Sequence, residues 1–345
     1  MSGWANWTQS DAGIFSRLQK LEVINCPNLI GDLPKELPSF VKLEVLKCPR
    51  LVASVKGATC LRDVVFEECE GVQLDKQGMS SVESLKISNF ASLEELASEQ
   101  GMELQNLTSL QALIIVDCNK MVSFPCGGLR APNLSTLGLH RCKNLKALPE
   151  QMHTLLPSLD LLEVLESPLI EFFPEGGLPS KLHKLFIGHC KKLVGGRRGW
   201  GLQSLSSLSC FALYGESEDD ALESFPEEGL LPSTLTSLQI YEMPNLKSLN
   251  IRGLQLLGSL RQMFIARCPQ LKSLPEEGLP TSLLQLHIRR CPLLAPRCRR
   301  EEGEEWHKIS HIPVIVIDGE PVIDQVCGGR RADLNKLYAI RVLKE

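Results

Sequence analysis

Thirteen cysteines give this 345-residue chain many side chains that can form disulfides, bind metals or act as nucleophiles. Eight of them follow short apolar stretches at recurring intervals: Cys26, Cys48, Cys69, Cys118, Cys142, Cys190, Cys268 and Cys291. No C-x-x-C pair occurs, and no histidine and cysteine lie at the spacing of tetrahedral zinc sites. The recurrence favours buried, reduced thiols that donate weak hydrogen bonds to backbone carbonyls, with disulfides or zinc as the alternatives.

Motifs for catalysis are missing from the sequence. It contains no G-x-x-x-x-G-K-[S/T] loop to hold a phosphate, no H-E-x-x-H and no G-x-S-x-G. The segment from Gly195 to Gly199 contains two arginines, which fits a flexible insertion or, as the alternative, a loop that binds an anion. The seven histidines are scattered. We therefore expect no enzyme activity, no cofactor and no bound metal.

The eight cysteines belong to a repeated sequence unit, L-x-x-L-x-[I/L]-x-x-C-x-x-L. The repeat is clearest between Leu260 and Cys298, where two copies begin 23 residues apart, at Leu260 and Leu283. Its central L-x-[I/L] alternates with period two, which predicts a short strand with one buried face. A unit of 20 to 29 residues with this signature is typical of a leucine-rich-repeat solenoid.

Twelve copies of the unit follow one another. They begin at Leu18, Phe40, Leu61, Val82, Leu110, Leu134, Leu159, Leu182, Leu208, Leu235, Leu260 and Leu283. The fold class is therefore a leucine-rich-repeat solenoid (an α/β horseshoe) with a parallel, concave β-sheet of about twelve short strands. The return segments are rich in proline and glycine, as in Phe173–Pro179, which predicts a mostly irregular convex side with little helix.

The chain divides into four parts by this pattern. Residues 1–17 are an incomplete N-terminal edge, 18–298 hold the twelve repeats, 299–319 form a C-terminal capping motif, and 320–345 are a weakly structured tail. In the capping motif, the β-branched residues of Ile312–Ile317 predict a closing strand, and Trp306 is predicted to cover the last core layer. An acidic insertion, Glu216–Asp220, reads as a solvated loop or, alternatively, a docking loop.

Charge and targeting signals limit the class of protein. The net charge is −4 and the pI is near 6.0, which argues against a nucleic-acid binder. The sequence has neither a signal peptide nor an apolar run of 18 residues, so we expect a soluble, cytoplasmic protein with no membrane partner. The sequons at Asn6, Asn106 and Asn133 are then expected to be unused.

The repeats also resemble a known family. Cys-Pro after the strand, the Leu-Pro-x-x-Gly-Leu-Pro return and the closing segment are similar to the C-terminal repeat region of plant nucleotide-binding disease-resistance proteins of the coiled-coil type. The most specific match is the closing segment, with Cys298, Gly303, Trp306, Lys308, Ile309, His311, Ile312, Pro313, Ile315, Ile317 and Asp318. The resemblance covers roughly residues 18–319. The coiled coil and nucleotide-binding ATPase module that precede the repeats in that family are not in this sequence.

This resemblance implies a recognition and autoregulatory role in an intracellular immune receptor. The implied partners are a pathogen effector or a host guard protein, and the receptor's own nucleotide-binding module. The repeats also fit a free-standing scaffold or adaptor without an immune role, and, more weakly, an extracellular receptor ectodomain.

The concave face supplies the candidate binding residues. On each strand, the residues that flank the buried pair point to the concave side. In the C-terminal half these outward positions hold Phe186, Tyr214, Tyr241, Phe264 and Arg289. Tyrosine and arginine dominate binding hot spots, and neighbouring strands lie about 4.8 Å apart. We therefore predict one contiguous protein-binding surface, against the alternative of unrelated surface aromatics.

Overall fold

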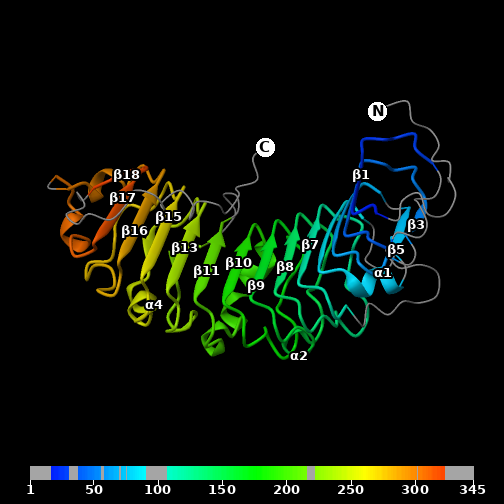
Figure 1. The fold of residues 1–345 in the computed structure, drawn as a ribbon. Helices are drawn as coiled ribbons and strands as arrows, with labels where there is room; N and C mark the ends of the chain where they lie inside the picture. Colours follow the sequence, from blue (N-terminus) through cyan, green and yellow to red (C-terminus); the bar gives the residue numbers. More distant parts are fainter. Residues whose placement is uncertain are drawn as a thin grey trace.

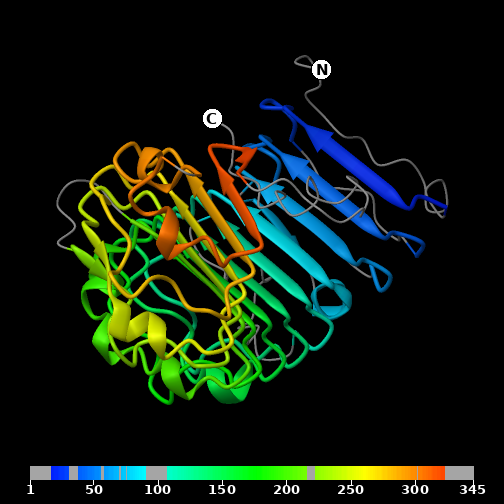
Figure 2. The same cartoon turned by 90° about the vertical axis from the view of Figure 1, so that its left-hand side faces the viewer.

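The computed structural model describes residues 17–30, 38–55, 58–69, 71–74, 76–90, 107–215, 222–300 and 302–322. In this part of the chain, fourteen strands form one sheet, ordered as they occur in the sequence. The first thirteen are parallel, and the last one turns back antiparallel. The sheet curves into an arc with its strands on the inner side and short helices on the outer side (Figure 1). Seen from the C-terminal end, the strands lie one behind another, and the return segments face them across the core (Figure 2).

The strands of the main sheet are β1 (Lys20–Ile24), β2 (Lys42–Leu46), β4 (Asp63–Glu67), β6 (Ser84–Ser88), β7 (Ala112–Val116), β8 (Thr136–His140), β9 (Leu161–Leu165), β10 (Lys184–Gly188), β11 (Cys210–Tyr214), β13 (Ser237–Tyr241), β15 (Gln262–Ala266), β16 (Gln285–Arg289), β17 (Val314–Ile317) and β18 (Glu320–Pro321). Two parallel pairs lie outside it: β3 (Ala53–Val55) with β5 (Val72–Leu74), and β12 (Ser224–Phe225) with β14 (Ser248–Leu249). The described helices are α1 (Lys76–Ser81), α2 (Met152–Leu155), α3 (Lys191–Gly195) and α4 (Ile251–Gln255), with 3-10 turns η3 (Arg197–Gly199), η4 (Leu202–Ser204), η5 (Pro296–Cys298) and η6 (Trp306–Lys308).

The predicted fold class is confirmed. Each of the twelve repeats contributes one five-residue strand, from β1 to β16, and the helices behind them have six residues or fewer. The capping motif adds β17 at the end of the same sheet, and the first residues of the predicted tail form β18, which pairs with β17 and so extends the ordered structure past residue 319. The N-terminal edge up to residue 16, the acidic insertion at 216–221 and the tail from residue 323 lie outside the described residues.

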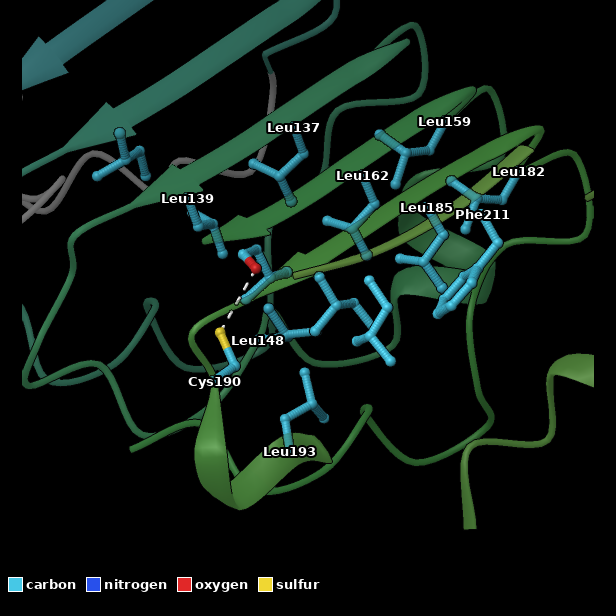
Figure 3. Close-up of a cluster of buried hydrophobic side chains, with 14 of the residues drawn as sticks. Leu137, Leu139, Leu148, Leu159, Leu162, Leu182, Leu185, Cys190, Leu193 and Phe211 are labelled. Carbon is cyan, nitrogen blue, oxygen red and sulfur yellow. Dashed lines mark hydrogen bonds between the residues drawn. The ribbon is translucent and has the colours of Figure 1, made fainter. Parts of the chain in front are cut away.

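The core lies between the sheet and the return segments. Leucines at the second and fourth positions of neighbouring strands point inward and meet leucines of the return segments, as in Leu162, Leu185 and Leu193 (Figure 3). Burying such a side chain stabilises the fold by about 1.5–3 kcal/mol. Because every repeat contributes to the same layer, the core runs along the whole solenoid.

The cysteine position is buried as predicted. All eight repeat cysteines are buried free thiols. The Cys190 thiol lies within hydrogen-bonding distance of two carbonyls, Val164 O on β9 (3.4 Å) and Gly188 O on β10 (3.1 Å), and shares its one proton between them. Figure 3 draws one of these hydrogen bonds as a dashed line. Ser167, which fills the same position one repeat earlier, donates to Leu165 O in the same way (3.1 Å). Burial raises the pKa of Cys142 to about 12, so the thiol stays protonated at neutral pH.

A left-handed residue connects nearly every strand to its cysteine position. The residues with positive φ at this point are Asn25, Lys47, Glu68, Asn89, Asp117, Arg141, Glu166, His189, Glu242, Arg267, Arg290 and, after β17, Asp318. The N–H of Arg141, for example, donates to Leu165 O on the next strand (2.9 Å). This hydrogen bond offsets the cost of about 1–2 kcal/mol that a left-handed L-residue carries. The turns form a row of polar side chains along one edge of the sheet.

The closing segment is attached to the repeats by a buried ion pair. The Glu305 carboxylate accepts from Leu274 N (2.9 Å), and Lys308 Nζ donates to Leu274 O (3.3 Å). The two side chains also contact each other at 3.1 Å, and each is 4% exposed. Trp306 packs, partly buried, against the core. The sequence predicts Trp306 as the residue that covers the last core layer. The structure adds the charged pair, Glu305 and Lys308, which hydrogen-bonds both backbone groups of Leu274.

Candidate functional site

Two tyrosines form the first part of the candidate site. Tyr214 on β11 and Tyr241 on β13 are register partners, and their rings stack at 4.8 Å between centroids with 20° between planes. The Tyr241 hydroxyl donates to Gln239 Oε1 (3.2 Å), which holds the second ring in place. The structure thus brings two of the five predicted residues into direct contact with each other.

Gly188 makes room for this stack. A Cβ at Gly188 would lie 2.7 Å from Tyr214 Cβ and 3.1 Å from Leu165 Cδ2. Tyr214 therefore lies close over the backbone of β10, where a larger side chain would push it away. Burial raises the pKa of Tyr214 to about 12, and the carboxylates of Glu163 and Glu242 add to the shift. The phenol is a neutral hydrogen-bonding group at physiological pH.

The second part is a stack of Phe264 on His287. Phe264 on β15 and His287 on β16 are also register partners, with centroids 4.5 Å apart and planes at 17°. Burial lowers the pKa of the His287 imidazole, so the ring is neutral at physiological pH. Sequence reasoning did not include His287 in the site, although its place in the same outward position as Phe264, one strand on, could have identified it.

The structure separates the two remaining predicted residues from these stacks. Phe186 is only 6% exposed, and its register partners are Glu163 and Ala212 rather than aromatic residues. It supports the concave surface from within. Arg289 is exposed at the end of β16, opposite Ala266. Of the five predicted residues, Tyr214 and Tyr241 stack on each other, Phe264 stacks on His287, Arg289 lies at the edge of these rings and Phe186 is covered. The predicted binding role stays a prediction.

Glutamines lie next to the rings on the same strands. Gln262 Nε2 donates to Gln285 Oε1 (3.3 Å), and Gln239 Nε2 approaches Cys210 Sγ (3.5 Å). We call the following set the aromatic patch: Tyr214, Gln239, Tyr241, Gln262, Phe264, Gln285, His287 and Arg289. Because His287 is neutral, Arg289 is the one formal charge in this set.

The rest of the concave face has a different character. On β2, Lys42 and Glu44 pair at 2.8 Å, and Lys20 pairs with Glu22 on β1. In the middle, His140 on β8 lies 3.0 Å from Glu163 on β9. On β1 and β2 the charges are thus paired within their own strands.

One arginine of the glycine–arginine segment is held by neighbouring groups of the fold. Arg197 of the glycine–arginine segment donates to Glu227 Oε1 (2.5 Å) and Val194 O (3.1 Å), so it has a structural role. Within the described ranges, no group of three or more His, Cys, Asp or Glu side chains is arranged to hold a metal ion. None of the helices that the structure describes has the length and apolar character needed to cross a membrane.

The fold and its concave face define a leucine-rich-repeat solenoid. No family model matches the chain. It is 40% identical over 197 residues to a disease resistance protein of Arabidopsis thaliana. The matched region is 57% of this chain and 13% of that protein. It is 46% identical over 52 residues to the disease resistance protein RGA4 of Solanum bulbocastanum, covering 14% of this chain and 5% of RGA4. The resemblance to plant disease resistance proteins is confirmed, and the matched regions are a small part of these relatives.

Among solved structures, the alignment with YopM from Yersinia enterocolitica WA-314 covers 79% of this chain and 60% of YopM. The TM-score is 0.33 and the sequence identity is 19%.

Proposed function

We propose that this chain is the protein-recognition and autoregulatory repeat region of an intracellular plant immune receptor, and that it binds proteins on its concave face. The similarity to plant disease resistance proteins supports the immune role. The observation that carries the binding role is the aromatic patch, in which two ring stacks lie side by side on the sheet. The partner is a pathogen effector or a host guard protein, and the receptor's own nucleotide-binding module is a second occupant of the same face.

The patch has the properties of a binding hot spot. Aromatic rings provide a large contact area at low cost in conformational entropy, and stacking and the Tyr241–Gln239 hydrogen bond restrict them further before a partner arrives. The glutamine amides offer donors and acceptors without carrying charge, so covering them requires little desolvation of ions. The paired charges of β1 and β2 lack this advantage.

Recognition and autoregulation predict different outcomes when the patch is damaged. If the patch binds an effector or a guard protein, its loss weakens recognition. If it holds the nucleotide-binding module in its resting position, its loss raises signalling in the absence of a pathogen.

The test is to replace Tyr241 and Phe264 by alanine together in the receptor that carries this repeat region. Truncating hot-spot residues costs about 2 kcal/mol or more, so we expect partner binding to weaken about 30-fold or basal signalling to rise. Phe172→Ala is the matched control, because Phe172 is 68% exposed and lies outside the sheet. Unchanged binding and unchanged basal signalling in a folded double variant would contradict the proposal.

A further inference from the structure

Two neighbouring arginines at the edge of the aromatic patch have side chains without a protein partner. Within the part of the chain that the structure describes, neither the Arg289 nor the Arg290 guanidinium makes an ion pair or a hydrogen bond. Asp318 is close, but its Oδ1 accepts from the backbone N–H of Arg290 (2.7 Å). Both arginines, with Cys291, Pro292 and Asp318, line one depression at the end of β16.

Several other arginines of the solenoid are paired with carboxylates. Arg141 binds the Asp117 carboxylate through two hydrogen bonds (2.8 and 2.7 Å), and the pKa of Asp117 is lowered by this contact. Arg197 pairs with Glu227 and Arg267 with Glu242. The fold thus neutralises these guanidinium groups across neighbouring repeats, while it leaves Arg289 and Arg290 exposed to solvent.

We propose that the partner of the aromatic patch presents an aspartate or glutamate side chain that binds in the depression lined by Arg289 and Arg290. This inference rests on the proposed function, since it names the chemistry of the segment that the patch receives. A partner that covered Arg289 without a carboxylate would bury an uncompensated charge, which is strongly unfavourable. An acidic side chain turns the same burial into a charge-assisted hydrogen bond of the bidentate kind that guanidinium groups favour.

The spacing of the strands sets the length of the segment. From Tyr214 on β11 to Arg289 on β16 there are three strand intervals, through β13 and β15. At about 4.8 Å each, they span about 14 Å, which an extended chain covers with about four residues. We therefore expect apolar or aromatic contacts over the ring stacks and, about four residues from the Tyr214 contact, a carboxylate over the depression.

The experiment is a selection of short random peptides on the complete 345-residue chain, followed by sequencing of the bound peptides. The variants are Arg289→Gln with Arg290→Gln, Tyr241→Ala with Phe264→Ala, and Arg198→Gln. Arg198 is an exposed arginine on η3, outside the sheet, and serves as the matched control. Circular dichroism confirms that each variant is folded before selection.

We expect peptides selected on the unmodified chain to be enriched in both aromatic and acidic residues. On the double-arginine variant the acidic enrichment disappears and the aromatic enrichment remains. A selected peptide should bind that variant about tenfold or more weakly, and its acid-to-amide analogue should lose a similar factor on the unmodified chain and little on the variant. Arg198→Gln should change neither result.

The outcomes separate this inference from the proposed function. Peptides that depend on Tyr241 and Phe264 but show no acidic enrichment would overturn the acidic-partner inference and leave the proposed function standing. If no selected peptide depends on Tyr241 and Phe264, both fail.

Discussion

The two ends of the concave sheet handle charge in opposite ways. At the first end, Lys42 and Glu44 neutralise each other on the surface of β2, and β1 repeats this arrangement. At the last end, the outward positions of β13, β15 and β16 carry rings and amides, and Arg289 is the single charge among these described positions. One ion pair of that region, Glu305 with Lys308, is buried beneath the surface.

In-register stacking explains this difference. Parallel pairing places Glu22 beside Glu44, so identical positions meet from one repeat to the next. Two carboxylates placed together repel each other, and a lysine two residues earlier on each strand compensates for that repulsion. Rings in equivalent positions attract each other and need no such compensation, as Tyr214 and Tyr241 show. The first end therefore pairs its charges with one another, and the last end carries rings and amides beside one cation.

The largest effect that this comparison predicts is on the buried pair. Glu305→Ala leaves the buried Lys308, among the acidic side chains that the structure describes, only the exposed Glu276 carboxylate (3.3 Å), and removing one partner of a buried ion pair costs about 3–5 kcal/mol. We expect a lower midpoint of urea unfolding, with the closing segment exchanging its amide protons faster. Glu304→Ala is the matched control, because Glu304 is the preceding residue and is exposed. Equal midpoints for the two variants would show that the pair does not hold the end of the solenoid.

A smaller loss of stability is expected when Gly188, which makes room for the tyrosine stack, is replaced. The added methyl group in Gly188→Ala would meet Tyr214 Cβ at 2.7 Å, and overpacking of this kind costs about 1–3 kcal/mol. Gly138→Ala is the control on the paired-charge side of the patch, since its new methyl would meet the flexible end of Ile114. Thermal unfolding measures the stability, and tyrosine fluorescence reports the stack. If Gly138→Ala lowers the stability as much as Gly188→Ala does, the close fit of Tyr214 over β10 makes no specific contribution to stability.

The acid sensitivity of the last end follows from Glu305. Burial raises the pKa of Glu305, but the Leu274 N–H and the Lys308 ammonium lower it by more, so the folded pKa is below the ordinary value. The stabilising effect is therefore complete above the unfolded pKa of about 4.3 and is lost as the pH falls through the lowered folded pKa. Unfolding midpoints measured between neutral pH and about pH 3 should fall more steeply for the unmodified chain than for Glu305→Gln. Parallel profiles would exclude Glu305 as the source.

The smallest effect is expected at the first end. Glu44→Gln removes a partly exposed surface pair with Lys42 and also the repulsion from Glu22, so the two consequences partly cancel. We expect an unfolding midpoint indistinguishable from that of the unmodified chain, at both low and high salt. A clear, salt-dependent loss would mean that the surface pairs of β2 contribute as the buried pair does.

The sequence allowed the architecture to be predicted in detail because the repeat is a local signal. Period-two alternation in each L-x-[I/L] identifies the strand, and the following cysteine marks its end. Once one strand is placed, stacking fixes the register of the others, and the repeat therefore predicts that Tyr214 and Tyr241 lie on one surface. The thiol positions followed from the same rule.

The candidate site was predicted less completely. Phe186 occupies an outward position by the same rule, yet it is covered, because exposure on a curved sheet depends on the size and direction of the neighbouring side chains. His287 has the same position and forms a stack that its residue type alone does not indicate. Position in the repeat predicts the direction of a side chain but not which neighbour it contacts.

What the sequence determined by itself is therefore everything that repeats: the number of repeat strands, their shared register, the leucine core and the buried thiols. What only the tertiary structure decided is whatever depends on contacts made once. Glu305 and Lys308 bind Leu274 from 31 and 34 residues away, and no periodicity links these positions. The same holds for the unpaired guanidinium groups of Arg289 and Arg290, since a charge is free or paired only according to what the folded chain brings within about 4 Å of it.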